Sequence, residues 1–334
     1  MLGTAMTRRL KADGYTNIVT RKHSELDLTR QADVDSFFSV EKPEFVFLFA
    51  ARVGGIADSL QHQADAFTIN TQIAVNVISA ASNSGVEKLL FTASSAVYPD
   101  GVPQPITEDM LLSGTGSSNL GGYAFSKIVG LKLCEYYCKQ YSDDFKAVIV
   151  PNLYGPNDRG STVMPMLFRK FSHAKMAGED SVSVWGTGGA RREFLHVDDL
   201  VDALLYLVNN NMDETYINIG SGVDISIKEL SLLIKKAFGY SGEIIFDTSK
   251  PEGVMQKLLD STKIKAMGWM PKISLQEGIS ILVKLLQNIK APSRISYKES
   301  GRVTLIKELH PLNAATSIVF TPSGIIMLIS ALHP

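Results

Sequence analysis

Tyr123 and Lys127 stand four residues apart in a segment that reads Tyr-Ala-Phe-Ser-Lys. On a helix, residues at this spacing lie one above the other on the same face. A lysine ammonium beside a phenol stabilises the phenolate, so the pair predicts a lowered pKa for Tyr123. Such a tyrosine can pass a proton to or from a substrate oxygen as a general acid or base. By itself this spacing does not identify a catalytic pair, because Tyr and Lys stand four residues apart by chance in many helices.

The segments around this pair alternate between apolar strands and helices. Strands are expected at residues 16–20, 45–50, 88–92 and 147–150, and helices at 64–84 and 123–140. Strands separated by helices of this length form right-handed βαβ units, which predicts an α/β fold with a doubly wound parallel sheet. Further on, helices are expected at 164–177, 197–209 and 226–238, with strands at 181–185 and 243–247. These elements indicate a smaller C-terminal substrate domain over the strand ends.

Small and hydroxyl residues follow three of the predicted strands. In an open α/β sheet the ligand lies outside the carboxyl ends of the strands, so these residues are the candidates for binding. Each segment taken alone is compatible with ordinary turn chemistry. The three segments are Ala51-Arg52-Val53-Gly54-Gly55-Ile56, Ala93-Ser94-Ser95-Ala96-Val97-Tyr98-Pro99 and Pro151-Asn152-Leu153-Tyr154-Gly155-Pro156.

The order and spacing of these segments around Tyr123 and Lys127 resemble the extended short-chain dehydrogenase/reductase family. Within it the chain is most similar to the GDP-L-fucose synthases, which are reductases and epimerases of a nucleotide-linked 4-keto-6-deoxyhexose. The resemblance runs from about Met1 to about Ile289 and leaves residues 291–334 unexplained. Further matching motifs are Trp185-Gly186-Thr187-Gly188, Arg192-Glu193-Phe194-Leu195-His196-Val197-Asp198-Asp199 and Lys250-Pro251-Glu252-Gly253, with Lys257 and Asp260 following.

The resemblance implies three catalytic residues. Ser94 would hydrogen-bond the substrate ketone, and Tyr123 would donate a proton to the same oxygen. Lys127 would hold the nicotinamide ribose and tune Tyr123. The hydride would come from the nicotinamide, because no side chain can supply one.

The expected cofactor is NADP(H). An NAD-preferring site places an acidic residue after the second strand, whereas this chain has Arg21-Lys22-His23, whose positive charge suits a 2′-phosphate. The cofactor residues that the resemblance implies are Gly3, Arg21, His23, Asp27, Leu28, Ala50, Thr92, Ser95, Lys127, Val150, Pro151, Asn152, Leu153 and Thr162.

The resemblance also implies a nucleotide-diphosphate sugar as substrate. Lys170, Arg192 and Lys257 match positions near that substrate, and cations suit a diphosphate. Trp185 matches a position beside it. Without the motifs, a surface Lys170, a core Trp185 and a salt-bridged Arg192 would be the default interpretations. His196 is expected to brace the domain junction, since no second histidine stands near it.

The sequence departs from the family's dinucleotide fingerprint at its start. The family has a strand followed by Gly-x-x-Gly-x-x-Gly and a helix, whose backbone and N-terminus cradle the pyrophosphate. Here only Gly3 remains, and the preceding strand, the expected centre of the sheet, is missing. We therefore expect an N-terminally truncated cofactor domain at residues 1–160, a substrate domain at 161–290 and an atypical, poorly ordered tail at 291–334. Such a chain should bind cofactor weakly or not at all.

Two acid/base positions of the family are also changed. The family's cysteine two residues after the catalytic serine is Ala96 here, and its histidine before Val-x-Pro is Thr162. Neither side chain moves protons readily at neutral pH, and epimerisation beside a ketone requires proton removal and return. The residues for ketone reduction remain, which favours a 4-keto reductase without epimerase activity.

Other functions stay open. A nucleotide-sugar 4-epimerase tolerates the Ser-Ala-Val-Tyr segment, whereas a 4,6-dehydratase usually has an Asp-Glu pair there. An inactive product that survives as a fold is a further alternative, and a cofactor titration would separate it from the enzymes.

Composition sets the broad class of protein. Hydrophobic residues make up 45% of the 334 residues, as in packed globular proteins. With 33 basic and 34 acidic side chains, no nucleic-acid partner is indicated. Cys134 and Cys138 share a helix face, and because the chain has no other cysteine, no metal site or disulfide framework is expected. Such a low cysteine content fits a reducing, cytoplasmic setting. A membrane anchor is not expected, because the uncharged run from Ala314 to Leu332 contains Pro322 and Gly324. The family resemblance implies a homodimer.

Overall fold

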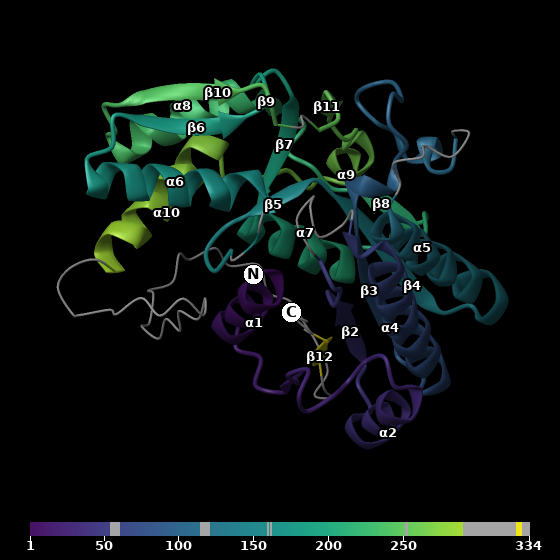
Figure 1. Ribbon diagram of the computed structural model, residues 1–334. Helices are drawn as coiled ribbons and strands as arrows, with labels where there is room; N and C mark the ends of the chain where they lie inside the picture. The colour runs from purple at the N-terminus through teal and green to yellow at the C-terminus, as the bar shows by residue number, and fades with distance from the viewer. Residues whose placement is uncertain are drawn as a thin grey trace.

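A six-stranded parallel sheet is the centre of the larger structural unit of the molecule (Figure 1). The computed structural model describes residues 1–53, 61–113, 121–158, 160, 162–250, 253–289 and 325–328. The strand order is β1-β12-β2-β3-β4-β8, and every neighbouring pair is parallel. The strands are β1 (Ile18–Thr20), β12 (Ile325–Leu328), β2 (Phe45–Leu48), β3 (Lys88–Ser94), β4 (Asp144–Val150) and β8 (Tyr216–Asn218).

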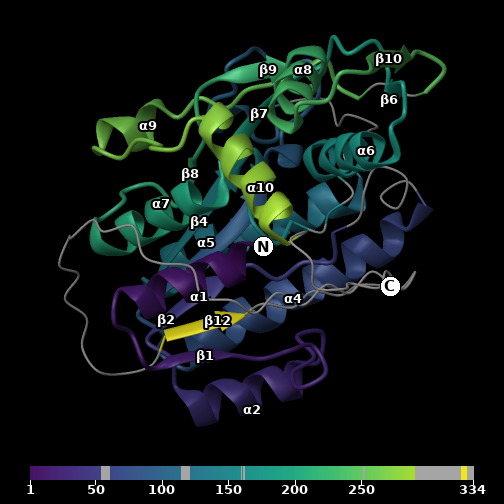
Figure 2. The same cartoon turned by 90° about the vertical axis from the view of Figure 1, so that its left-hand side faces the viewer.

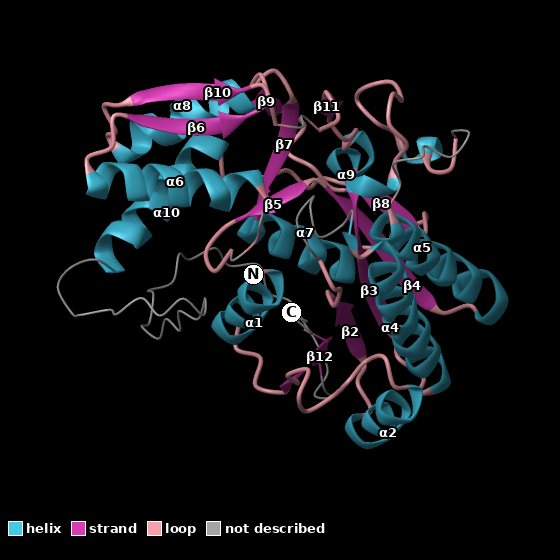
Figure 3. Cartoon of the chain, in the orientation of Figure 1, coloured by secondary structure: helices cyan, strands magenta, loops and turns pink. Residues whose placement is uncertain are grey.

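Helices cover both faces of this sheet. The helices on one face are α2 (Gln31–Glu41), α4 (Gln63–Asn83) and α5 (Gly122–Tyr141), and those on the other are α1 (Leu2–Ala12) and α7 (Val197–Asn209) (Figure 3). All four residues of β2 are buried, as a strand covered on both faces requires. This is the doubly wound α/β arrangement that the alternating pattern predicts.

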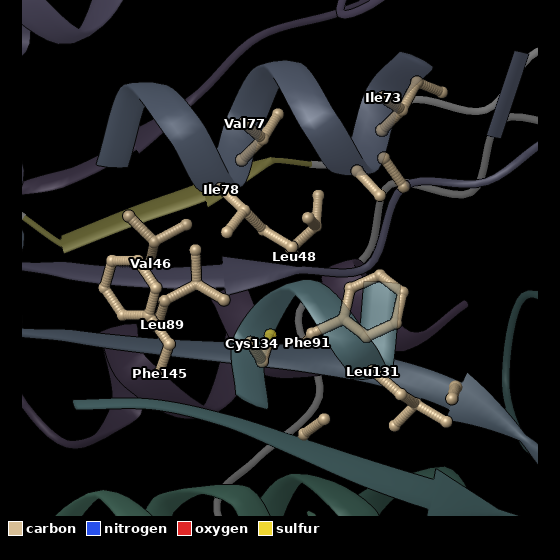
Figure 4. Close-up of a cluster of buried hydrophobic side chains, with 14 of the residues drawn as sticks. Val46, Leu48, Ile73, Val77, Ile78, Leu89, Phe91, Leu131, Cys134 and Phe145 are labelled. Carbon is tan, nitrogen blue, oxygen red and sulfur yellow. The ribbon is translucent and has the colours of Figure 1, made fainter. Parts of the chain in front are cut away.

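The core beneath α4 and α5 is continuous with the sheet. Ile73, Val77 and Ile78 point from α4 toward the strands, where they meet the side chains of Val46 and Leu89 in one buried cluster (Figure 4). Leu131 and Cys134 of α5 belong to the same cluster. The helix that carries Tyr123 and Lys127 is therefore held against the sheet by close packing.

The C-terminal strand β12 lies between β1 and β2 (Figure 2). Its residues pair in register with both neighbours, Ile325 standing beside Ile18 on one side and Phe45 on the other. Residues outside the family resemblance thus contribute a strand at the place where the sequence lacks one. Apart from residues 325–328, the predicted tail lies outside the described residues.

A second group of elements sits over the carboxyl ends of the large sheet (Figure 1). Strands β6 (Ser181–Trp185) and β10 (Glu243–Asp247) pair in parallel and pack with the helices α6 (Val163–Ala177), α8 (Ile227–Phe238) and α10 (Leu275–Ile289). A small sheet joins β5 (Asn152–Tyr154), β7 (Arg191–His196), β9 (Asp224–Ser226) and β11 (Gln256–Lys257). Short helices complete the described elements: η1 (Ser95–Val97), η2 (Glu108–Met110) and α9 (Thr262–Ala266).

Most elements expected from the sequence are present within a few residues of their predicted bounds. The strands predicted at 45–50 and 88–92 are β2 and β3, and the helix predicted at 64–84 is α4. The strands β5, β8, β9 and β11 were not predicted, because two or three residues are too few for a clear alternating pattern. Strand β7 has six residues and was also missed, because apolar and polar residues do not alternate along it. The predicted domain boundaries, between residues 160 and 161 and between residues 290 and 291, stay predictions. Within the described residues, no helix has the length and apolar character needed to cross a membrane.

Candidate active site

Ser94 ends β3 and opens the short helix η1. It stands in register with Val150, the last residue of β4, so the two predicted ligand-binding strand ends are adjacent. The Ser94 hydroxyl accepts a hydrogen bond from the Ala96 N–H at 3.3 Å. This bond orients the hydroxyl at the carboxyl edge of the sheet, and it places Ala96 directly beside it.

Helix α5 approaches β3 closely because Gly130 has no side chain. A Cβ at this position would lie 2.2 Å from the ring of Phe91 on β3. The close approach lets Lys127 reach the strand, and its Nζ donates a 2.9 Å hydrogen bond to the Thr92 carbonyl. The ammonium also lies over the Phe91 ring, 4.6 Å from the centroid. Lys127 is thereby tied to the strand that ends in Ser94.

The expected lowering of the Tyr123 pKa is wrong for this structure. Burial raises the pKa of Tyr123 to about 12. Burial also lowers the pKa of Lys127 to about 7, because a charged ammonium is poorly solvated inside the protein. The physical reason is burial of the phenol, which disfavours the charged phenolate. The Nζ of Lys127 turns to the Thr92 carbonyl and the Phe91 ring. A helical spacing predicts a shared face and leaves the direction of a long side chain open.

Lys257 lies against the loop that follows Ser94. Its Nζ is 3.4 Å from the Ser95 carbonyl, 3.3 Å from the Tyr98 carbonyl and 3.6 Å from an Asp100 carboxylate oxygen. Burial lowers the Lys257 pKa, and the Asp100 carboxylate opposes that effect. Asp100 was missed in the sequence, and no pattern there pointed to it.

Arg192 and Lys257 are neighbours in the small sheet. They stand in register on the parallel strands β7 and β11, and the guanidinium of Arg192 lowers the pKa of Lys257 further. The Arg192 side chain passes close to Gly253, where a Cβ would lie 2.8 Å from a guanidinium nitrogen. The structure thus brings two of the predicted substrate cations together, and Lys257 reaches the loop after Ser94.

The residues predicted around the nicotinamide form a continuous segment from β4 into β5. Val150 and Pro151 are buried, and Leu153 is half-buried. The Asn152 side-chain amide donates a 3.1 Å hydrogen bond to the Glu193 carbonyl. This segment begins beside Ser94 and leads to the small sheet that carries Arg192.

The predicted adenine end of the site gathers around β1 and α2. Arg21 pairs with Glu41 and lies over the Phe37 ring at 5.4 Å, so its cation has an internal partner. The other predicted residues there are placed as follows: His23 Nδ1 lies 3.9 Å from Asp27, Leu28 and Ala50 are buried, and Gly3 is buried in the first turn of α1.

The site fits one end of a dinucleotide well. Thr92 Oγ1 is buried and makes no hydrogen bond within the described part of the chain. It stands on β3 between the Phe91 ring and Ser94, where the resemblance puts the nicotinamide ribose. A ligand with hydroxyl groups would satisfy this orphaned oxygen. The segment at residues 54–60, which includes Gly54-Gly55-Ile56, lies outside the described residues.

Three further predicted residues stand at α6 and β6: Lys170 on α6, Trp185 at the end of β6 and Thr162 directly before α6. Lys170 Nζ donates to the Ser183 carbonyl at 2.6 Å, so the structure gives it a partner on β6. Trp185 is 49% exposed, which excludes a core role. Thr162 is exposed and precedes the first turn of α6.

His196 caps helix α7, as a bracing residue would. Its Nδ1 accepts a 3.2 Å hydrogen bond from the Asp198 N–H, and burial lowers its pKa. Cys134 and Cys138 are free thiols on α5. Among the described residues, no group of His, Cys, Asp and Glu side chains is arranged to hold a metal ion.

Comparison with known proteins decides the family. The profile described as "NAD dependent epimerase/dehydratase family" matches residues 1–220. The chain belongs to this family. It is 47% identical over 284 residues to the putative GDP-L-fucose synthase 2 of Arabidopsis thaliana, a match that covers 84% of this chain and 87% of that protein. It is 41% identical over 293 residues to the GDP-L-fucose synthase of Escherichia coli strain K12, covering 84% and 91%.

Solved structures agree with this assignment. A GDP-mannoheptose C4 reductase from Campylobacter jejuni with NADP bound has a TM-score of 0.80 and 38% sequence identity. That match covers 86% of this chain and 95% of the reductase. The recognition from sequence motifs is therefore confirmed, and so is the predicted parallel sheet with a smaller C-terminal unit.

Proposed function

We propose that this protein reduces the 4-keto group of a GDP-linked 4-keto-6-deoxyhexose with NADPH, in nucleotide-sugar biosynthesis, and does not epimerise the sugar. The observation that carries the reductase part is the meeting of Ser94, Lys127 and Val150 at adjacent strand ends, with Tyr123 on the same helix as Lys127. Relatives named GDP-L-fucose synthase at 41–47% identity supply the substrate class.

Each residue has a role that its surroundings support. The Ser94 hydroxyl donates a hydrogen bond to the ketone oxygen and fixes its position. Tyr123 donates the proton to that oxygen, and a pKa raised to about 12 keeps the phenol protonated at neutral pH. Lys127 and Thr92 hold the nicotinamide ribose beside Ser94. Bound NADPH supplies the hydride.

NADP(H) is the cofactor supported by both relatives and residues. The Campylobacter jejuni reductase carries NADP, and a GDP-L-fucose synthetase from Naegleria fowleri, 25% identical with a TM-score of 0.77, is bound to NADP. Lys22 and His23 follow β1, where a 2′-phosphate is expected. Arg21 is paired with Glu41 and serves to fix the loop.

The absence of epimerisation rests on Ala96 and Thr162. Ala96 lies beside Ser94 through its N–H and has no group that can move a proton. Thr162 offers a hydroxyl, which is a poor acid or base near neutral pH. Two similar Campylobacter jejuni structures are named as a C4 reductase and a GDP-6-OMe-4-keto-L-xylo-heptose reductase, which is consistent with reduction as the whole reaction.

Isotope incorporation tests this proposal. The protein is incubated with NADPH and GDP-4-keto-6-deoxymannose in deuterated water, and the product is examined by NMR and mass spectrometry. We expect reduced product with hydrogen from NADPH at C4 and no deuterium at C3 or C5 beyond a protein-free control. Enzyme-dependent deuterium at either carbon would refute the loss of epimerisation. Absence of any reduction, together with no NADPH binding in a titration, would favour the inactive alternative.

We also propose that the protein is cytoplasmic and that two copies pair through α4 and α5. Both helices expose large apolar side chains, among them Phe67 and Val75 on α4 and Phe125 and Tyr136 on α5. Burying them between copies removes apolar surface from water. Sedimentation of the protein and of a Tyr136→Glu variant tests this pairing: a dimer should become a monomer, and a monomeric wild-type protein contradicts it.

A further inference from the structure

Glu193 is a buried carboxylate to which the proposed reaction gives no task. It lies on β7 between Arg192 and Phe194, and its exposed fraction is 0%. Burial raises its pKa, and hydrogen bonds from Leu259, Gly222 and Ser221 oppose that effect. In the described part of the chain its partners are N–H and O–H donors, without a cation. Burying a charged carboxylate without a cation costs free energy, which its hydrogen bonds offset in part.

The carboxylate joins two separate backbone segments to β7. One oxygen accepts the Leu259 N–H at 2.9 Å. The other accepts the Gly222 N–H at 2.7 Å and the Ser221 hydroxyl at 3.2 Å. The carboxylate packs closely against Gly220, where a Cβ would lie 2.3 Å from a carboxylate oxygen, so a larger residue does not fit there.

These contacts surround the two cations at the site. Arg192 precedes Glu193 on β7, and Lys257 lies two residues before Leu259. Successive side chains of a strand point to opposite faces, so Glu193 points inward where Arg192 points outward. Arg192 and Lys257 stand in register, and Lys257 reaches the loop after Ser94. The hydrogen bond to Leu259 therefore fixes the strand that carries Lys257 against the strand that carries Arg192.

The backbone of Glu193 also contacts β5, which carries residues predicted to lie around the nicotinamide. Its carbonyl accepts the Asn152 side-chain amide at 3.1 Å. One residue thus connects β5, β7, the turn at residues 220–222 and the segment after β11.

We propose that Glu193 is a positioning residue that holds Arg192 and Lys257 at the separation a sugar-nucleotide diphosphate requires. The proposal rests on the proposed function for the identity of the ligand. Arg192 and Lys257 bind the diphosphate, and Glu193 acts through them.

Glu193→Gln is the direct test, because glutamine has nearly the same size and offers a single acceptor oxygen. One of the two N–H donors then faces an NH₂ group. Hydrogen bonds to a charged group are worth roughly 1.5–3 kcal/mol, or a factor of about 10–100. We expect the KM for the GDP-sugar to rise about tenfold or more, kcat to change much less, and NADPH affinity to stay at the wild-type value.

Glu277→Gln is the matched control. Glu277 also accepts a backbone N–H, from Ser274 at 3.0 Å, at the exposed start of α10. It should leave KM, kcat and NADPH affinity unchanged. Ser221→Ala is a milder variant that removes the 3.2 Å bond to Glu193 and, with it, the bonds of the same hydroxyl to the Val223 backbone, while the Leu259 and Gly222 bonds to the carboxylate stay. It should raise KM by about two- to threefold. It keeps the proposal testable where Glu193→Gln fails to fold, which thermal unfolding would reveal.

Titration with GDP, measured by calorimetry without turnover, separates the two proposals. If the wild-type protein binds GDP but does not reduce the sugar, and Glu193→Gln binds GDP about tenfold more weakly, the positioning role stands and the proposed function fails. Wild-type values of GDP affinity and KM in a folded Glu193→Gln protein would overturn the positioning role. An equal loss of kcat and NADPH affinity would also overturn it, since that indicates a general structural effect.

Discussion

Replacing Lys127 with methionine should remove a large pH dependence of stability. Burial lowers the pKa of Lys127 to about 7 from its ordinary value of 10.5. Between these two pH values the unfolded chain holds a proton at Lys127 that the folded chain does not. The free energy of unfolding therefore rises with pH across this window, by about 1.4 kcal/mol per pH unit for one proton. Over the whole window the sum approaches about 5 kcal/mol.

Methionine is unbranched, similar in length and cannot titrate, so Lys127→Met isolates this contribution. Urea unfolding of both proteins at pH 7, 8, 9 and 10 gives the free energy of unfolding at each pH. We expect the wild-type curve to rise by about 1–1.4 kcal/mol per pH unit relative to the variant. Other groups that titrate here, such as the thiols of Cys134 and Cys138, are common to both proteins and cancel in the difference.

Lys228→Met provides the control, because Lys228 is exposed on α8. Its curve should run parallel to that of the wild-type protein. Parallel curves for wild type and Lys127→Met would refute the reasoning. They would mean that the Thr92 carbonyl and the Phe91 ring keep the buried ammonium charged throughout the range.

Tyr123→Phe should lower kcat by about 10²–10⁴ with NADPH affinity kept, because it removes the proton donor; an unchanged kcat in a reduction assay would contradict its role. The double variant Ala96→Cys with Thr162→His should introduce enzyme-dependent deuterium at C3 or C5 in the isotope assay, and a product without it would show that further groups are needed. Gly130→Ala should destabilise the fold by about 1–3 kcal/mol in urea unfolding, since its Cβ would lie 2.2 Å from an aromatic ring of β3; wild-type stability would argue against the close approach of α5. Deleting residues 325–334 removes the strand that β1 and β2 both pair with, so amide exchange in β1 and β2 should accelerate at least about tenfold. Unchanged protection of those amides would contradict the pairing of β12.

Local patterns in the sequence predicted much of the fold. The apolar run at Phe45–Leu48 is a buried strand, and the alternation of strands and helices gave the parallel sheet. The strand ends at Ser94 and Val150 were predicted as ligand-binding and lie side by side. These features depend on the periodicity of apolar residues over short stretches of chain. Similarly, the change to Ala96 is a matter of side-chain chemistry and needs no structure.

The direction of side chains and the choice of distant partners were decided by the tertiary structure alone. Lys127 turns to a strand carbonyl, and burial of Tyr123 raises a pKa that the sequence predicted to be lowered. Lys257 meets the Ser95 carbonyl across about 160 residues of sequence, and the burial of Glu193 follows from three segments that converge on it. Strand β12 joins the sheet where two strands leave backbone groups to be paired. The physical reason is common to all four: burial and hydrogen-bond satisfaction depend on which segments meet in space, and local sequence does not record that.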